Sequence, residues 1–189
     1  MVLFVVGWIV NNTPSIKMIL PMMQQYVLTL IGNDKPGLVD SLAQAVKRRK
    51  GNWLESRMAN LAGKFSGIVL VSIASTERQA FETEIIELKK LGLSVRATPV
   101  ESVSELGRHT SILNLVANDR PGILSELTSA LAALMVNVEE LTTGCTPAPM
   151  SGGVLFNASL TVSIPDSLND ADLKAALEEL ADDLMVEID

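Results

Sequence analysis

The sequence predicts an α+β fold in which one β-α-β-β-α-β unit occurs twice. Two observations carry this prediction: a nine-residue motif that recurs, and the same order of hydrophobic patterns after each occurrence. Residues 31–39 read IGNDKPGLV and residues 116–124 read VANDRPGIL. With a shift of 85 residues, residues 27–55 match the later copy at ten of 29 positions without a gap. Repetition at a fixed spacing indicates a duplicated module.

The first copy is predicted to contain four strands and two helices. Pro36 suits the first helical position, because proline fixes φ and lacks an N–H that a helix start does not use. Thr76 and Gln79 have the spacing of a capping box for the second helix, and Gly92 is expected to end it. The predicted strands, chosen for apolar or alternating residues, cover residues 26–32, 52–61, 64–75 and 93–99.

The second copy repeats this order. A helix is predicted from Pro121, a loop over 146–153, and a second helix capped by Asn169 or Asp170. The strands are predicted at 110–117, from Val136, at 154–164 and at 184–188. Alternation of apolar and polar residues within 154–164 is typical of an antiparallel sheet with one covered face. Both copies therefore fit the ferredoxin-like arrangement, antiparallel strands with both helices on one face.

The repeat divides the chain into domains. We expect an N-terminal extension over residues 1–23, a first domain over 24–99, a linker over 100–108 and a second domain over 109–189. The apolar run at the start of the chain is ten residues long, too short to span a bilayer as a helix. A natural start at Met22 or Met23 is the preferred interpretation of the extension. An element packed on the first domain, or a membrane anchor, are the alternatives.

Composition narrows the classes of function. The net charge is −7 and the sequence pI is about 4.8, so the chain is a poor general ligand for nucleic-acid phosphates or anionic lipid. Cys145 is the only cysteine and His109 the only histidine, so an internal disulfide is impossible and a nucleophile–base pair would need these two to meet. We expect no catalytic residue, no cofactor and no metal site, and the single cysteine favours a reducing environment.

The repeated motif has its own chemistry. A turn from a strand into a helix leaves the first helical N–H groups without partners, and these groups attract a carboxylate or another anion. Gly37 and Gly122 lack a Cβ, so a small ligand can approach the backbone closely. Asp34 and Asp119 can accept hydrogen bonds from an ammonium group. A free amino acid fits both requirements, although an ordinary capping turn without a ligand explains the same residues.

The segments GNDKPGLVDSLAQAVKRRKGNW and ANDRPGILSELTSALAALMVNV closely resemble ACT domains, small regulatory modules that often bind amino acids. Their typical pattern is a strand, a D/N-x-P-G turn, a helix, and then G-x-N at the second strand. Two such domains without a further domain resemble the glycine cleavage system transcriptional repressor family. The chain departs from the ACT pattern at Val136, which replaces a glycine, and by an aspartate in each turn where asparagine is common.

The resemblance implies a ligand held between paired domains, with the turn of one domain facing the second-strand asparagine of the other. Carried over, the two sets of binding residues are Asn33, Asp34, Gly37 and Leu38 with Asn137, and Asn118, Asp119, Gly122 and Ile123 with Asn52.

The resemblance also implies a cytoplasmic location and a set of partners. These are a small amino acid such as glycine, a LysR-type transcriptional activator and a second copy of the chain, with no direct contact to nucleic acid or membrane. An ACT-only allosteric subunit of an amino-acid metabolic enzyme, or an adaptor without a small-molecule ligand, are the alternatives.

Overall fold

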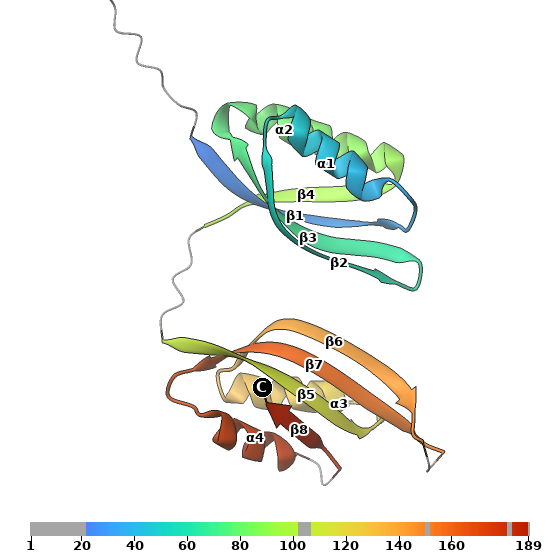
Figure 1. Cartoon of the computed structure of the whole chain (residues 1–189), viewed down its shortest axis with the longest axis vertical. Helices are drawn as coiled ribbons and strands as arrows, with labels where there is room; N and C mark the ends of the chain where they lie inside the picture. Colours follow the sequence, from blue (N-terminus) through green and yellow to red (C-terminus); the bar gives the residue numbers. More distant parts are fainter. Residues whose placement is uncertain (1–21, 102–106, 150–151, 181–182, 189) are drawn as a thin grey trace, which may run out of the picture. The chain divides into compact units, whose positions relative to one another are not determined.

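The computed structural model describes residues 22–101, 107–149, 152–180 and 183–188. They form two compact units, one on each side of residues 102–106 (Figure 1). Each unit is a four-stranded antiparallel sheet with helices on one face, so the predicted α+β class with two ferredoxin-like units is confirmed. Most of the extension predicted over residues 1–23, and the middle of the linker predicted over 100–108, lie outside the described residues. The predicted domain boundaries therefore stay predictions.

The first unit follows the predicted order of elements, with two short 3-10 helices added. Its elements are β1 (Met23–Asn33), α1 (Leu38–Arg48), β2 (Asn52–Leu61), β3 (Lys64–Ala74), η1 (Ser75–Glu77), α2 (Arg78–Glu87), η2 (Leu88–Leu91) and β4 (Leu93–Pro99). The strands lie in the order β2-β3-β1-β4, and all neighbours are antiparallel. Because β1 is a central strand, the turn that follows it lies in the middle of one end of the sheet.

The second unit repeats this topology. Its elements are β5 (Arg108–Asn118), α3 (Ile123–Ala133), β6 (Asn137–Pro147), β7 (Val154–Pro165), α4 (Asp170–Glu178) and β8 (Met185–Ile188). The strand order is β6-β7-β5-β8. The second strand of each unit has a register shift at the same place in the repeat, between Trp53 and Glu55 and between Val138 and Glu140. Strand β6 continues through Pro147, into the segment predicted to be a loop.

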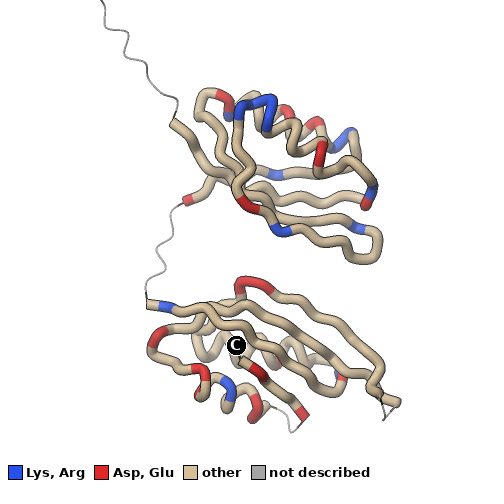
Figure 2. Tube along the Cα trace, in the orientation of Figure 1, with Lys and Arg blue, Asp and Glu red and all other residues tan. Residues whose placement is uncertain are grey.

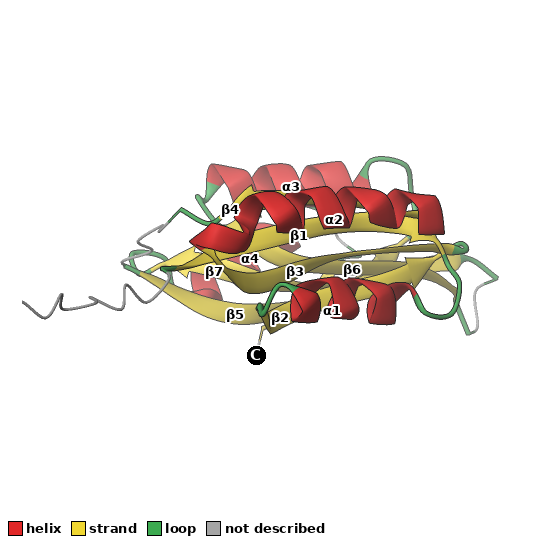
Figure 3. Ribbon diagram, turned by 90° about the horizontal axis from the view of Figure 1, so that it is seen from above, coloured by secondary structure: helices red, strands yellow, loops and turns green. Residues whose placement is uncertain are grey.

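Each unit has its own hydrophobic core, built from buried side chains of the strands and the helices. Figure 3 shows the helices in red and the strands in yellow. In β1 the side chains of Tyr26, Leu28 and Leu30 are buried and alternate with side chains on the open face of the sheet. In β7 the apolar side chains from Phe156 to Ile164 are buried at alternate positions, as the sequence predicts. No buried side-chain N or O atom of the described residues lacks a hydrogen-bond partner, which is normal for a native core.

The helices begin later than predicted. Pro36 and Pro121 do not occupy the first helical position; α1 begins at Leu38 and α3 at Ile123. The reason is the glycine after each proline. Gly37 has φ of +89°, in the left-handed region, so the helix can begin only after it.

The two predicted caps of the second helices had different outcomes. The capping box at Thr76 and Gln79 is wrong, because η1 occupies residues 75–77 and the cap of α2 makes no side-chain hydrogen bond. The cap of α4 is confirmed: the side chain of Asn169 accepts a hydrogen bond from the backbone N–H of Asp172 at 2.8 Å.

The fully buried side chain of Leu42 supports the first core, whereas that of Leu61 in the same unit is 79% exposed. We expect Leu42→Ala to lower the free energy of unfolding of the first unit by about 2–5 kcal/mol, because it removes buried apolar area and leaves a cavity. Leu61→Ala should change it by less than about 0.5 kcal/mol. Urea unfolding followed by the fluorescence of Trp53, which packs against this core, measures both. Equal effects of the two variants would contradict the position of the core.

Candidate functional site

The candidate site of the first unit is the turn between β1 and α1. Gly37 caps the helix, and no side chain accepts a hydrogen bond from the first helical amides at this cap. Such amides have no partner within their own helix, and they form the positive end of the helix dipole. A Cβ placed on Gly37 would meet no atom within 4 Å. The helix start is therefore open and suited to an anionic group.

An open hollow of about 290 Å³ lies at this turn. It is lined by Asp34, Lys35, Pro36, Gly37, Leu38, Val39, Asp40 and Phe65. Its volume is close to the lower end of small-molecule sites, about 300 Å³. Lys35 forms no ion pair with any of the residues that the structure describes. Its ammonium lies near Gly92, and rotation of this exposed side chain could bring it to a carboxylate held by the helix amides. Asp34 and Asp40 could hold an ammonium.

Asn33 and Asp34 are both exposed and contact the β2–β3 hairpin. The Asn33 Oδ1 accepts a hydrogen bond from Lys64 Nζ at 2.5 Å, and Asp34 Oδ2 accepts one from Asn60 Nδ2 at 2.5 Å. The backbone N–H of Asp34 donates to the Gly63 carbonyl at 3.0 Å. These contacts fix one rim of the hollow. Because they are exposed, a ligand could replace the side-chain bonds at little net cost.

The first unit brings four predicted site residues together in one turn, with one difference from expectation. Asn33, Asp34 and Gly37 present polar or open groups to solvent. Leu38 has a side chain only 3% exposed, packed in the core, so only its backbone can serve a ligand. The side chain of Ile123 is likewise packed in the core of the second unit, with 8% exposure.

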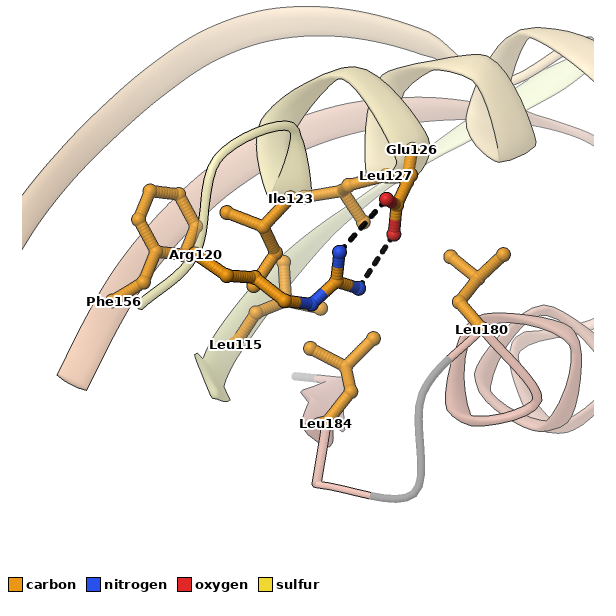
Figure 4. A pocket seen from close by; sticks show the side chains of 8 residues that line it. All are labelled: Leu115, Arg120, Ile123, Glu126, Leu127, Phe156, Leu180 and Leu184. Carbon is orange, nitrogen blue, oxygen red and sulfur yellow. Dashed lines mark hydrogen bonds and ion pairs between the residues drawn. The ribbon is translucent and has the colours of Figure 1, made fainter. Parts of the chain in front are cut away.

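In the second unit, the turn between β5 and α3 is covered by the side chains of the chain itself (Figure 4). Gly122 caps α3 with φ of +94°, as Gly37 caps α1. Arg120 donates to both carboxylate oxygens of Glu126, at 2.8 Å from Nη1 and 2.5 Å from Nη2. Glu126 Oε1 lies 3.7 Å from the point that a Cβ on Gly122 would occupy. The carboxylate thus covers the side of the glycine that is open in the first unit.

The space under this ion pair is a narrow apolar crevice of about 10 Å³. It is lined by Leu115, Arg120, Ile123, Glu126, Leu127, Phe156, Leu180 and Leu184. Figure 4 shows the Arg120–Glu126 pair between the start of α3 and the side chains of Leu180 and Leu184. A cavity of this volume holds about one water at most. It has no room for an amino acid in this conformation.

Asp183 makes a second internal contact at this turn. Its Oδ2 accepts hydrogen bonds from the backbone N–H of Asn118 at 2.9 Å and from Asn118 Nδ2 at 2.7 Å. These two bonds hold the pKa of the Asp183 carboxyl below its usual value. The hydrogen bond from Arg120 likewise lowers the pKa of Glu126. Both carboxylates are therefore ionised at neutral pH.

The predicted second-strand asparagines lie far from the turn of their own unit. Asn33 is paired with Lys64, and Asn52 with Ser72, eight residues further along β3. At about 3.3 Å per residue this separation is roughly 26 Å. The same separation holds for Asn137 and the turn of the second unit. Neither unit alone brings all its predicted site residues together, so the predicted pairing between domains stays a prediction.

The sequence prediction missed four side chains that decide the character of the two turns: Lys35, Arg120, Glu126 and Asp183. The repeat carried a signal for one of them, since the shift of 85 residues places Ser41 opposite Glu126. No pattern pointed to Asp183, which follows α4 and meets Asn118 only through the fold.

Two of the four basic residues at 47–50 form ion pairs within the first unit. Nε of Arg48 and Nε of Arg49 contact the two carboxylate oxygens of Glu84 on α2, at 2.5 and 2.6 Å. Burial, the largest influence, raises the pKa of Glu84, but the combined hydrogen bonds from the two arginines outweigh it and the pKa is lowered. These arginines join α1 to α2, which reduces what the run offers to a partner.

His109 and Cys145 do not form a catalytic pair. Nε2 of His109 lies 3.2 Å from Asp170 Oδ1, at the start of α4, and Cys145 is exposed on β6. Within the described ranges no group of three or more His, Cys, Asp or Glu side chains could hold a metal ion. Among these residues no helix is long and apolar enough to cross a membrane.

Family comparisons match both units. Residues 24–98 and residues 111–182 each match an ACT domain. The chain belongs to the ACT-domain family and carries two ACT domains in tandem, as the sequence motifs predicted.

Three similar proteins cover both units of the chain. The glycine cleavage system transcriptional repressor of Escherichia coli K12 is 23% identical over 160 residues, which are 84% of each chain. A solved structure of an unknown protein from Galdieria sulphuraria covers 89% of this chain and 98% of its own, with 28% identity and a TM-score of 0.75. A structure provisionally described as a glycine cleavage system transcriptional repressor has 18% identity, covers 89% and 97%, and has a TM-score of 0.65. The chain is thus an ACT-domain regulator that resembles this repressor.

The lowered pKa of Asp183 gives a pH dependence. A carboxyl whose pKa is lower in the folded state adds stability above its unfolded pKa, and this is lost as pH falls through the folded pKa. We expect the second unit to lose stability below about pH 4, near the ordinary carboxyl pKa, and Asp183→Asn to flatten this loss. Unfolding in urea between pH 6 and pH 3 measures the slope.

Glu179→Gln is the matched control for this pH dependence. Glu179 is exposed in the same unit and forms no ion pair among the described residues. Its variant should keep the slope of the unaltered chain. An unchanged slope in Asp183→Asn would show that the contact with Asn118 adds nothing in solution.

Proposed function

We propose that this chain is a non-catalytic, cytoplasmic regulator that responds to a small amino acid and represses the glycine cleavage system. It acts by contact with a DNA-bound activator of the LysR type. The proposal draws on the tandem ACT domains and on the similarity to the glycine cleavage system transcriptional repressor of Escherichia coli. The single observation that carries amino-acid binding is the open hollow beside the free amides of α1.

The chemistry of the hollow supports a zwitterion. The positive end of α1 favours a carboxylate, as does the ammonium of Lys35, which forms no ion pair with any described residue. Asp34 and Asp40 on the rim favour an ammonium. The bare backbone of Gly37 admits a ligand close to the helix start. A small side chain, such as that of glycine, suits a shallow hollow of this size. The predicted contact with Asn137 of a paired ACT domain would complete the site.

The acidic excess of the second unit supports a protein partner over DNA for that unit, whereas the first unit has a basic excess. Residues 24–98 carry 11 basic and seven acidic side chains, whereas residues 107–189 carry three basic and 13 acidic ones. Figure 2 shows acidic residues along α4 and the segments on either side of it. An acidic surface repels nucleic-acid phosphates. The ligand would then change regulation by binding one state of the protein complex more tightly than another. A second copy of the chain is a further partner in this proposal, as the family resemblance implies.

Amino-acid binding is tested by calorimetric titration of the full chain with glycine, with acetate and with methylamine. We expect glycine to bind and each half-ligand to bind at least about tenfold more weakly, since each engages only one charge of the hollow. Gly37→Val should abolish binding because its side chain enters the hollow. Gly63→Val is the control: Gly63 also has a positive φ and open space around it, but it does not line the hollow. No heat with glycine, alanine or serine at millimolar concentration would contradict the proposal.

The partner is tested with the purified activator of the operon and a labelled operator fragment. We expect no mobility shift with this chain alone, and a further shift of the activator–DNA complex when the chain is added. The second shift should change with glycine. The proposed contact with the activator would be wrong if the chain alone shifts the operator fragment. It would also be wrong if the mobility of the activator–DNA complex does not change when the chain is added, a result that would favour an enzyme partner.

A further inference from the structure

We infer that the two ACT domains have divided their roles, and that Glu126, with Asp183, keeps the second turn closed to ligand while the first turn stays open. This inference rests on the proposed function for the meaning of the open turn. The closure itself rests on contacts within the second unit.

The internal carboxylates stand where an outside one would bind. Glu126 covers the bare side of Gly122 and accepts one hydrogen bond from each of the two Nη atoms of Arg120. Asp183 takes the two N–H groups that Asn118 presents at the end of β5. A ligand carboxylate would have to displace two ionised groups that are already held by charge-assisted hydrogen bonds. These contacts cover the turn without a ligand, although no side chain accepts a hydrogen bond at the cap of α3.

One position of the repeat separates the two turns. Ser41 occupies the place of Glu126, and its hydroxyl donates to the Gly37 carbonyl at 2.8 Å, back along the helix. It is too short to reach across the turn. Lys35, in the place of Arg120, points toward the corner before β4, where its Nζ lies 3.5 Å from the Cβ position of Gly92. The cation of the first turn therefore stays free of any carboxylate partner among the described residues.

The two hollows reflect this difference. The first has a volume of about 290 Å³, and the second, under the Arg120–Glu126 pair, about 10 Å³. The main chain of the two turns is nearly the same, because φ of the capping glycine is +89° in one and +94° in the other. Side chains, and not the backbone, therefore decide which turn is accessible.

Exchange of side chains between the turns tests the inference in the full chain. Calorimetric titration with glycine should give one site per chain in the unaltered protein. Ser41→Glu should lower the affinity at least about tenfold by placing a carboxylate over Gly37. Glu126→Ser with Asp183→Asn should raise the stoichiometry toward two. Glu126→Gln alone, which keeps the size of the side chain, should leave one site.

A readout without ligand keeps this inference separate from the proposed function. In the unaltered protein, hydrogen exchange of the Asn118 amide should be slowed by its bond to Asp183, and Asp183→Asn should accelerate it about tenfold or more. If glycine does not bind but this acceleration occurs, the proposed function fails and the closure stands. Two sites in the unaltered chain, one site in the double variant, or unchanged exchange would each overturn the inference.

Discussion

Both candidate turns depend on one constraint, the left-handed backbone conformation of the glycine that follows Pro36 and of the glycine that follows Pro121. Gly37 and Gly122 have φ near +90°, a region that side chains with a Cβ avoid. This conformation stops the strand, delays the helix by two residues, and leaves the first amides of the helix facing outward without a side-chain cap. The same constraint creates a need for a partner at the helix start. The two units differ in the side chains that lie over the bare glycine.

In the second unit, the side chains of Arg120 and Glu126 cover the bare glycine, although α3 too has no side-chain hydrogen bond at its cap. Glu126 is on the first turn of α3, where a carboxylate is favoured by the helix dipole, and Arg120 fixes its position. Exposed ion pairs contribute little to stability, so closure of the turn is a more useful account of this pair than stabilisation of the fold. Asp183 adds hydrogen bonds to an amide that would otherwise face solvent. The first unit keeps the same backbone and lacks these side chains.

Duplication followed by divergence gives a regulator two units of equal fold and unequal surface. The cores have kept aliphatic residues at matching positions, and even the register shift in the second strand is shared. The surfaces have separated in charge, with a basic excess in the first unit and a strong acidic excess in the second. Each surface can change in this way because selection on one surface does not disturb the other core.

The sequence by itself determined the duplication, the order of strands and helices, and the glycine turn with its exposed helix start, because these depend on local periodicity and on backbone preferences of Pro36 and Gly37. The sequence predicts helix starts that are two residues too early, because glycine can adopt either sign of φ and its residue type does not fix the value at Gly37. It also predicts the same role for both turns. Only the tertiary structure decided which turn is open. Asp183 meets Asn118 across 65 residues of chain, and the exposed side chain of Glu126 forms an ion pair with Arg120. Such contacts depend on where folded elements bring side chains, which no local pattern encodes.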